Sequence, residues 1–322
     1  MGTSSFAVPA LRALYEKGED IAFVVTQPDR IRGRGKAVIP TPVKQYAESV
    51  NIKVVQPEEI RDNEDFARSL DEAMVDLIVV ASYGKLLPQE ILKKPKLGCI
   101  NIHASLLPKY RGAAPIQWAI ADGQAITGVT LMHMSEGLDD GDIGASATIE
   151  IESMNAGVLE EKLAEMGATL LLENLDKIRE GKLMRIPQDD SQSTYARMLS
   201  KEDAHIDLSQ DAKTVINRIN AMNPVPGSYV IQGDTSVKIK KAHIKEVCDI
   251  STGEKNDDYI ENTKKDFNIS VGSIIAVSDA GIEIKLSDGI LVIEEIGMPG
   301  KRPMTVKDYL RGNKIDMSIQ FN

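Results

Sequence analysis

The chain has 322 residues, of which 42% are hydrophobic and 27% charged, and its formal net charge at pH 7 is −10. This length predicts two globular domains, and the negative charge argues against indiscriminate binding of nucleic acid, because affinity for phosphate comes from clustered lysine and arginine. No apolar run reaches the roughly 18 to 20 residues of a membrane helix, and Cys99 and Cys248 are too few for a disulfide framework, so we expect a cytoplasmic protein with neither disulfide nor metal.

Residues 1–81 alternate between patterns typical of helices and of strands. Residues 27–42 hold three prolines and a Gly-Arg-Gly pair, so we expect an exposed, irregular, basic loop there. The continuous apolar run at residues 77–81 is typical of a parallel strand covered on both faces. Strands separated by helices predict a doubly wound α/β sheet, whose ligand crevice lies beyond the carboxyl ends of the strands. The other expected elements here are helices at residues 6–17, 43–50 and 58–74 and strands at residues 21–26 and 53–55.

The next strand pattern carries two polar side chains on one face. Residues i and i+2 of a strand point to the same side, so Ile100 and Ile102 share one face. Asn101 and His103 share the other. Burying an amide or an imidazole without partners costs roughly 1 to 3 kcal/mol, so this pair must be hydrogen-bonded inside the protein or face a cleft. Residues 82–84 also follow a strand, and we expect both groups at one cleft.

An acidic, glycine-rich turn at residues 136–143 includes Asp139. An amide can stabilise an oxyanion, an imidazole can move protons near neutral pH, and a carboxylate can orient the imidazole, which together suit acyl transfer to an amine. Two alternatives remain open. Asn101 and His103 can form a satisfied polar pair at a strand end, and Asp139 can be a turn former. The remaining expected elements of this half are helices at residues 114–121 and 158–179 and a strand at residues 127–134.

The second half of the chain has a different pattern. Residues 187–205, rich in Asp, Ser and Gln, predict a linker between a first domain at residues 1–186 and a second at residues 206–322. Short alternating strands then predict a small barrel of the oligonucleotide-binding (OB) type. Residues 253–268 are polar and charged and predict a mobile surface insertion. The expected elements are a helix at residues 211–222 and strands near residues 228–232, 236–245, 272–278, 281–286 and 290–296.

Short segments spread over the chain carry a resemblance to a known family. They are QPDR (27–30), GRGK (33–36), YGKLLP (83–88), LGCINIHASLLPKYRGAAPI (97–116), GLDDGD (137–142), LSKE (199–202), NPVP (223–226) and SDG (287–289). Together they closely resemble the methionyl-tRNA formyltransferases, which are formyl-folate-dependent. The resemblance implies that a formyl group passes from 10-formyltetrahydrofolate to the α-amino group of methionine on initiator tRNA. It also implies a Rossmann-like formyltransferase domain followed by an OB-like tRNA-binding domain, and we expect a monomer.

The resemblance assigns catalytic and folate-binding roles position by position. Asn101, His103 and Asp139 match the catalytic trio of the family. Tyr83 is expected to line the folate cleft or simply to pack. The segment that matches the folate-contacting part of the family consists of Ser105, Leu106, Leu107 and Pro108.

Contact with tRNA is expected from basic residues in two places. Arg34 lies in the loop that, by the resemblance, reads the acceptor end of the tRNA, although a solvated charge run is the usual meaning of such a stretch. Lys238 and Lys240 share a strand face and can follow a phosphate backbone, although lysine on an edge strand also prevents aggregation. The expected tRNA-binding residues are Arg30, Arg32, Arg34, Lys36, Lys238 and Lys240.

The sequence departs from the family pattern at three places. The family begins with an apolar strand that leads into a Met-Gly-Thr turn, whereas this sequence starts at that turn, so we expect the first strand to be missing. Val225 stands where the family usually has tryptophan, and residues 253–268 have no obvious counterpart. The alternative functions are formyl transfer to glycinamide ribonucleotide or to a sugar nucleotide, hydrolysis of formyl-folate, and RNA binding without catalysis if the missing strand abolishes the folate site.

Overall fold

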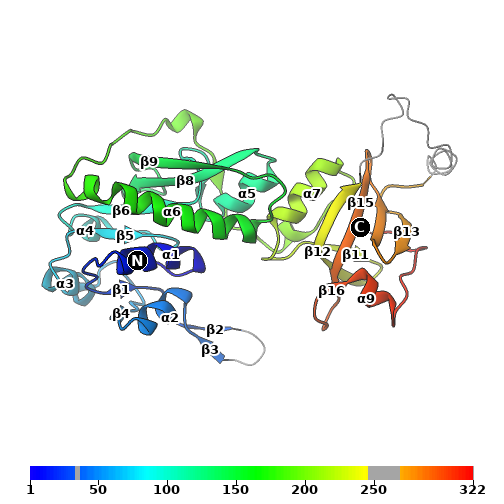
Figure 1. The fold of residues 1–322 in the computed structure, drawn as a ribbon, viewed down its shortest axis with the longest axis horizontal. Helices are drawn as coiled ribbons and strands as arrows, with labels where there is room; N and C mark the ends of the chain where they lie inside the picture. The colour runs from blue at the N-terminus through cyan, green and yellow to red at the C-terminus, as the bar shows by residue number, and fades with distance from the viewer. Residues whose placement is uncertain (33–36, 246–268, 322) are drawn as a thin grey trace. The chain divides into compact units, whose positions relative to one another are not determined.

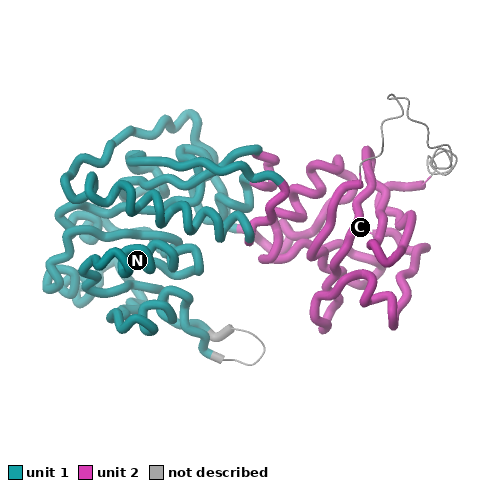
Figure 2. Tube along the Cα trace, in the orientation of Figure 1, with its two compact units in different colours: residues 1–119, 125–152, 158–198 teal, residues 120–124, 153–157, 199–322 magenta. Residues whose placement is uncertain are grey.

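The computed structural model describes residues 1–32, 37–245 and 269–321. The chain divides into two compact units, drawn in teal and magenta in Figure 2. Unit 1 comprises residues 1–119, 125–152 and 158–198, and unit 2 comprises residues 120–124, 153–157 and 199–322. Among the described helices, none is both long and apolar enough to span a membrane.

The first part of the chain alternates helices and strands as predicted (Figure 1). Polar caps mark where helices begin: Thr41 Oγ1 accepts a hydrogen bond from the amide of Lys44, and Asn63 Oδ1 accepts one from the amide of Phe66. The elements are η1 (Ser5–Ala7), α1 (Val8–Glu16), β1 (Val24–Val25), β2 (Arg30–Arg32), β3 (Ala37–Ile39), α2 (Pro42–Ser49), β4 (Val54–Val55), α3 (Glu64–Glu72), β5 (Ile78–Val80), α4 (Gln89–Leu92), β6 (Cys99–His103), β7 (Arg111–Gly112), α5 (Pro115–Ala121), β8 (Ile126–His133), β9 (Ile143–Glu150), α6 (Ala156–Arg179), η2 (Asp190–Gln192) and β10 (Tyr195–Ala196).

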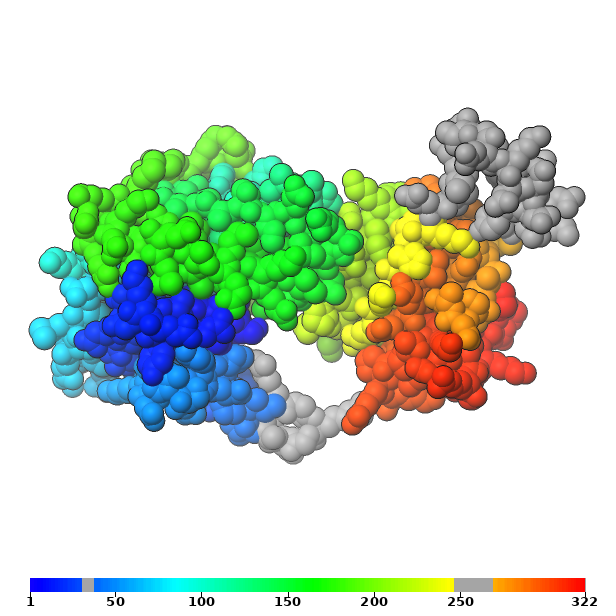
Figure 3. Space-filling view, viewed as in Figure 1, coloured from blue at the N-terminus to red at the C-terminus, as the bar shows by residue number. Residues whose placement is uncertain are grey.

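The main sheet of unit 1 has the strand order β5-β6-β8-β9. β5 and β6 are parallel, whereas β8 is antiparallel to both β6 and β9. The long helix α6 crosses the sheet (Figure 1) and covers much of the visible face of unit 1 (Figure 3). At Gly167 of α6 a Cβ atom would lie only 2.6 Å from Cγ2 of Ile102, so the absent side chain lets α6 approach β6 closely.

The sheet is interrupted between β1 and β5. β1 pairs only with β4, in parallel, and among the described residues Met1 and Gly2 alone join β1 to β5. The amide of Gly2 donates to the carbonyl of Val25 at 2.9 Å, and the amide of Ala81 donates to the carbonyl of Met1 at 3.0 Å. A cavity of about 590 Å³ lies here, lined by β1, β5 and α1.

Unit 2 is built on an antiparallel sheet with the strand order β11-β12-β15-β14-β13, to which β16 adds beside β15. The sheet is curled, and its core contains the fully buried Ile239, Ile284, Leu291 and Ile293. The five strands expected from the sequence are present. The elements are η3 (Glu202–Ala204), α7 (Ala212–Ala221), β11 (Tyr229–Gln232), β12 (Thr235–Lys245), β13 (Ile274–Ser278), β14 (Gly281–Lys285), β15 (Ile290–Gly297), β16 (Met304–Thr305) and α9 (Val306–Leu310).

Four features noted in the sequence have different outcomes. Residues 187–198, expected to form part of a linker, lie in unit 1, where β10 pairs in parallel with β7. Residues 27–42, expected to be irregular, include the antiparallel hairpin arms β2 and β3. The insertion predicted at residues 253–268 lies outside the described residues. Val225 is 72% exposed, so its side chain packs little.

Candidate active site

The polar pair predicted on one strand lies on β6. All five residues of β6 are buried, and the strand lies between β5 and β8. Ile100 and Ile102 fill one face, with Ile102 below Gly167 of α6. Asn101 and His103 project from the opposite face, because alternate residues of a strand point to opposite sides. The apolar face therefore anchors the strand, and the polar face carries groups able to do chemistry.

Asp139 meets both side chains from the turn that follows β8. Its Oδ1 accepts a hydrogen bond from Nδ2 of Asn101 at 3.4 Å and lies 3.7 Å from Nδ1 of His103. Its Oδ2 accepts a hydrogen bond from the amide of Gly112 at 2.9 Å. The Asp139 side chain is 14% exposed, so the carboxylate is largely screened from bulk water but not sealed off. The structure thus brings the three predicted residues together.

The hydrogen bond made by His103 fixes which ring nitrogen carries the hydrogen. Nε2 of His103 lies 2.9 Å from the carbonyl oxygen of Tyr110, and a carbonyl oxygen only accepts, so Nε2 donates. In the neutral ring Nδ1 then carries the lone pair, and Nδ1 is the nitrogen that faces Asp139. His103 can therefore accept a proton at Nδ1. The Asp139 carboxylate then faces the positive charge on the ring.

Hydrogen bonds attach the segment after β6, which is predicted to contact folate, to β8. Ser105 is fully buried, and its hydroxyl donates to the carbonyl of Lys109 at 2.6 Å. Thr130 Oγ1 donates to the carbonyl of Ser105 at 2.7 Å and accepts from the amide of Leu107 at 3.3 Å. Leu106 packs against Gly128, where a Cβ atom would lie 2.6 Å from its Cδ2. Leu107 is buried and Pro108 half-buried, so the segment has a fixed backbone just after His103.

Tyr83 lies in the apolar core of unit 1. Its side chain is 2% exposed and packs in a cluster that includes Val25, Phe66 and Leu87. Burial raises the pKa of the phenol to about 12, and the hydroxyl makes no hydrogen bond within the described part of the chain. This buried position favours a packing role for Tyr83 over a place in the lining of the folate cleft.

Residues 186–196 make contacts around the site that the sequence analysis did not anticipate. Nε2 of Gln188 donates to the carbonyl oxygens of Asp139 at 2.8 Å and Gly141 at 2.7 Å. Oε1 of Gln188 accepts from Nε of Arg111 at 2.9 Å, and Arg111 also forms an ion pair with Asp190 at 2.8 Å. Hydrophobic periodicity gives no signal for these contacts, because polar groups make all of them.

The basic residues predicted to bind tRNA are only partly described. Arg30 begins β2 and is exposed, whereas the side chain of Arg32 is not described, and Arg34 and Lys36 lie outside the described residues. On the partner arm of the hairpin, Val38 and Ile39 are 60% and 42% exposed. The hairpin thus presents apolar as well as basic side chains to solvent.

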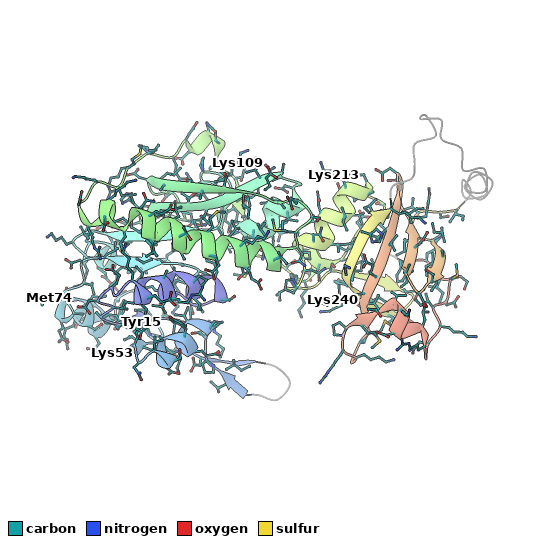
Figure 4. The ribbon with its side chains drawn as sticks, in the orientation of Figure 1. Tyr15, Lys53, Met74, Lys109, Lys213 and Lys240 are labelled. Carbon is teal, nitrogen blue, oxygen red and sulfur yellow. The ribbon has the colours of Figure 1, made fainter. Side chains whose placement is uncertain are left out.

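Lys238 and Lys240 of β12 converge near Gly227, which precedes β11. A Cβ atom at Gly227 would lie 3.3 Å from Nζ of Lys240, which Figure 4 labels, and 3.4 Å from Nζ of Lys238. Burial, followed by the charge of Lys238, lowers the pKa of Lys240. Neither lysine has a carboxylate partner among the described residues, whereas Lys241 and Lys245 on the same strand pair with glutamates at 2.6 and 3.1 Å. Two unpaired ammonium groups this close favour a bound anion.

Among the described residues, no cluster of three or more His, Cys, Asp or Glu side chains could hold a metal ion. Cys99 is buried in β6, as its strand pattern predicted, and burial raises the pKa of its thiol to about 12. A thiol in this state is a poor nucleophile.

Comparison with known proteins identifies the fold and the family. The formyl transferase family model matches residues 1–175, and the model of the formyl transferase C-terminal domain matches residues 198–314. The chain is 43% identical over 318 residues to a methionyl-tRNA formyltransferase of Clostridium novyi (strain NT), covering 98% of this chain and 97% of that protein. It is 44% identical over 316 residues to a methionyl-tRNA formyltransferase of Caldanaerobacter subterraneus subsp. tengcongensis, covering 98% and 96%.

Two solved structures share the fold at lower identity. The N-formyltransferase of Helicobacter canadensis, in complex with folinic acid and dTDP-3-aminofucose, is 19% identical with a TM-score of 0.63, covering 91% of this chain and 96% of that one. HypX of Aquifex aeolicus, in complex with tetrahydrofolic acid, is 22% identical with a TM-score of 0.56, and the match covers 86% of this chain but only 47%, about half, of HypX. The two family models and the two full-length matches above show that the chain belongs to the methionyl-tRNA formyltransferase family of formyl transferases.

Proposed function

We propose that the protein transfers a formyl group from 10-formyltetrahydrofolate to the α-amino group of methionine on initiator tRNA, for translation initiation. Membership of the family supports this reaction. The observation that carries the assignment of residues is the convergence of Asn101, His103 and Asp139, with both polar groups of β6 within 3.7 Å of one carboxylate oxygen. An amide, an imidazole and a carboxylate suit acyl transfer to an amine, which needs no serine or cysteine nucleophile because the amine itself attacks.

The reaction follows from what each group can donate or accept. The neutral α-amine attacks the formyl carbon, so that a new carbon–nitrogen bond forms and the carbonyl oxygen becomes an oxyanion. Nδ2 of Asn101 has two hydrogens, one directed at Asp139 and one able to stabilise that oxyanion. Nδ1 of His103 accepts the proton from the attacking nitrogen and returns it to N10 of the folate. The bond between the formyl carbon and N10 then breaks, and tetrahydrofolate leaves with N10 as a neutral amine.

The folate is proposed to lie against residues 105–108. Only Ala104 separates this segment from His103. Thr130 fixes its backbone through two hydrogen bonds, and the Ser105 hydroxyl bonds to the carbonyl of Lys109 just beyond it. A folate bound in this position would have its formyl carbon next to the trio without a rearrangement of the protein. Tyr83 would support this region from the core rather than touch the ligand.

The tRNA is proposed to contact both units. The curled sheet of unit 2 is proposed to be an OB-like barrel, and the unpaired ammonium groups of Lys238 and Lys240 support a phosphate contact on β12. In unit 1, Arg30 and Arg32 on β2 lead into the segment with Arg34 and Lys36, and we keep these four residues as proposed tRNA contacts. Since all residues of the trio come from one chain, we propose that the protein acts as a monomer, in the cytoplasm where initiator tRNA is used.

Asn101→Ala tests the catalytic assignment. Removal of one oxyanion donor typically lowers kcat by about 100- to 1000-fold, so we expect a loss in that range with folate binding and melting temperature retained. A kcat within tenfold of the unaltered protein would contradict the role of Asn101. The acceptor is tested separately, by comparing charged initiator tRNA with glycinamide ribonucleotide and a sugar nucleotide. Faster formylation of either small acceptor, or tRNA binding without turnover, would favour an alternative function.

A further inference from the structure

Residues 186–196, which we name the strap, return to the site after α6 and are attached to it at both ends. At the start, Ile143 and Ile186 exchange backbone hydrogen bonds of 2.8 and 3.0 Å. At the end, β10 pairs in parallel with β7, so that Tyr195 lies opposite Arg111 and Ala196 opposite Gly112. The strap therefore spans from the edge of β9 to the backbone that donates to Asp139.

Gln188 is the residue of the strap that reaches the Asp139 turn. Both hydrogens of Nε2 are used, one on the carbonyl of Asp139 and one on the carbonyl of Gly141. The opposite end of the same amide accepts from Nε of Arg111, whose guanidinium is held in turn by Asp190. Because a flipped amide would place Oε1 against two carbonyl oxygens and Nε2 against a donor, only one orientation satisfies every partner.

The turn that Gln188 holds has an unfavourable backbone conformation. Asp139 has a φ of 51°, in the left-handed region that residues with a side chain rarely adopt. The other side of the turn has no free space, since a Cβ atom at Gly141 would lie 1.8 Å from the carbonyl oxygen of His133. Gln188 holds the turn through the carbonyls of Asp139 and Gly141. Its two hydrogen bonds act directly on the Asp139 backbone, beside the bond that the Asp139 side chain accepts from the Gly112 amide.

The strap also holds the backbone that orients His103. Oγ1 of Thr194 accepts from the amide of Tyr110 at 2.8 Å, and the carbonyl of Thr194 accepts from the amide of Arg111 at 2.9 Å. The carbonyl of Tyr110 is the acceptor for Nε2 of His103. The same short segment therefore fixes the partners of both His103 and Asp139.

We propose that Gln188 is a positioning residue for formyl transfer, which holds Asp139 at Asn101 and His103, and that Arg111 orients the Gln188 amide. This inference rests on the proposed function, because it takes Asp139 to be part of the catalytic trio. Gln188 does not touch the reacting atoms. Its effect is therefore on the chemical step rather than on the binding of either substrate.

Gln188→Glu is the most informative substitution. It keeps the length of the side chain and the acceptor for Arg111, but it places a carboxylate oxygen against the carbonyls of Asp139 and Gly141. Since a displacement of about 1 Å at a catalytic group can cost about 100-fold in rate, we expect kcat to fall by 10- to 100-fold. The Michaelis constants for folate and tRNA should stay within about threefold. Gln192→Glu is the matched control, because Gln192 lies in the strap but, among the described residues, its side chain donates to Asp189 and not to the Asp139 turn.

A double-mutant cycle with Asp139→Ala separates this inference from the proposed function. If Gln188 acts through Asp139, Gln188→Glu should lower kcat less than twofold further once Asp139 is alanine. Absence of formyl transfer by the unaltered protein would overturn the proposed function, and an unchanged kcat in Asp139→Ala would overturn the role of Asp139. A low kcat in Asp139→Ala, together with a normal kcat or an equal further loss for Gln188→Glu, would overturn only the positioning role. Should Gln188→Glu not fold, Arg111→Lys carries the same test, with a smaller loss that also disappears in the Asp139→Ala background.

Discussion

Removal of the two converging ammonium groups on β12 should weaken tRNA binding in a salt-dependent way. Lys238→Gln and Lys240→Gln together delete the two charges that approach Gly227 and have no carboxylate partner in the described structure. If each neutralises one phosphate, the slope of log affinity against log salt should become shallower by about 1.4 to 1.8, from about 0.7 to 0.9 per contact. Between 50 and 200 mM salt, which is 0.6 of a log unit, the defect should therefore shrink by about tenfold.

The assay is formylation of charged initiator tRNA at several salt concentrations, with kcat/KM for the tRNA plotted against salt. The double variant Lys241→Gln and Lys245→Gln is the matched control, because it changes the net charge equally on the same strand but removes lysines that already pair with Glu294 and Glu283. The folate Michaelis constant should be unchanged in both. Parallel salt slopes for the two double variants would refute the reasoning that unpaired ammonium groups bind the phosphate backbone.

Two further substitutions test the surroundings of the trio. Gly141→Ala would place a Cβ atom 1.8 Å from the carbonyl of His133, so the Asp139 turn must move. We expect about a 100-fold loss of kcat, whereas Gly312→Ala, where a Cβ atom meets nothing within 4 Å, should leave kcat unchanged, and equal activities would contradict the tight fit. Burial lowers the pKa of His133 below its usual 6.5, so the unfolded chain binds more protons just below pH 6.5 and stability should rise with pH in that window. In urea unfolding, His133→Gln should flatten this rise, and an unaltered pH dependence would show that His133 does not cause it.

The parts of the site that follow from strand periodicity could be predicted from the sequence. The alternation along β6 placed Asn101 and His103 on one face, and the structure agrees because an apolar sheet leaves a buried strand little choice of register. The chemistry of Asp139 suggested a connection to them but left a turn former as the alternative, and the resemblance was needed to decide, since no local pattern shows which turn lies opposite a given strand. Family resemblance therefore supplied the long-range part of the site.

Polar contacts explain what the sequence analysis missed. Residues 187–198 have the composition of a linker, yet hydrogen bonds rather than apolar burial attach them to β7 and the Asp139 turn. β9 was not expected because its two isoleucines are separated by small residues such as Gly144, Ala145 and Ser146, and its alternating exposure is that of a sheet edge. The hairpin arms β2 and β3 were obscured by the prolines and glycines around them.

The packing of α6 on β6 disfavours any other register of β6. A shift of β6 by one residue would turn Asn101 and His103 toward Gly167, where the close helix leaves no room or partners for them, and would turn two isoleucines into the polar site. Both faces of β6 therefore disfavour the shifted register. A folded but misaligned and inactive form is therefore strongly disfavoured, so that molecules which complete this sheet also complete the catalytic geometry.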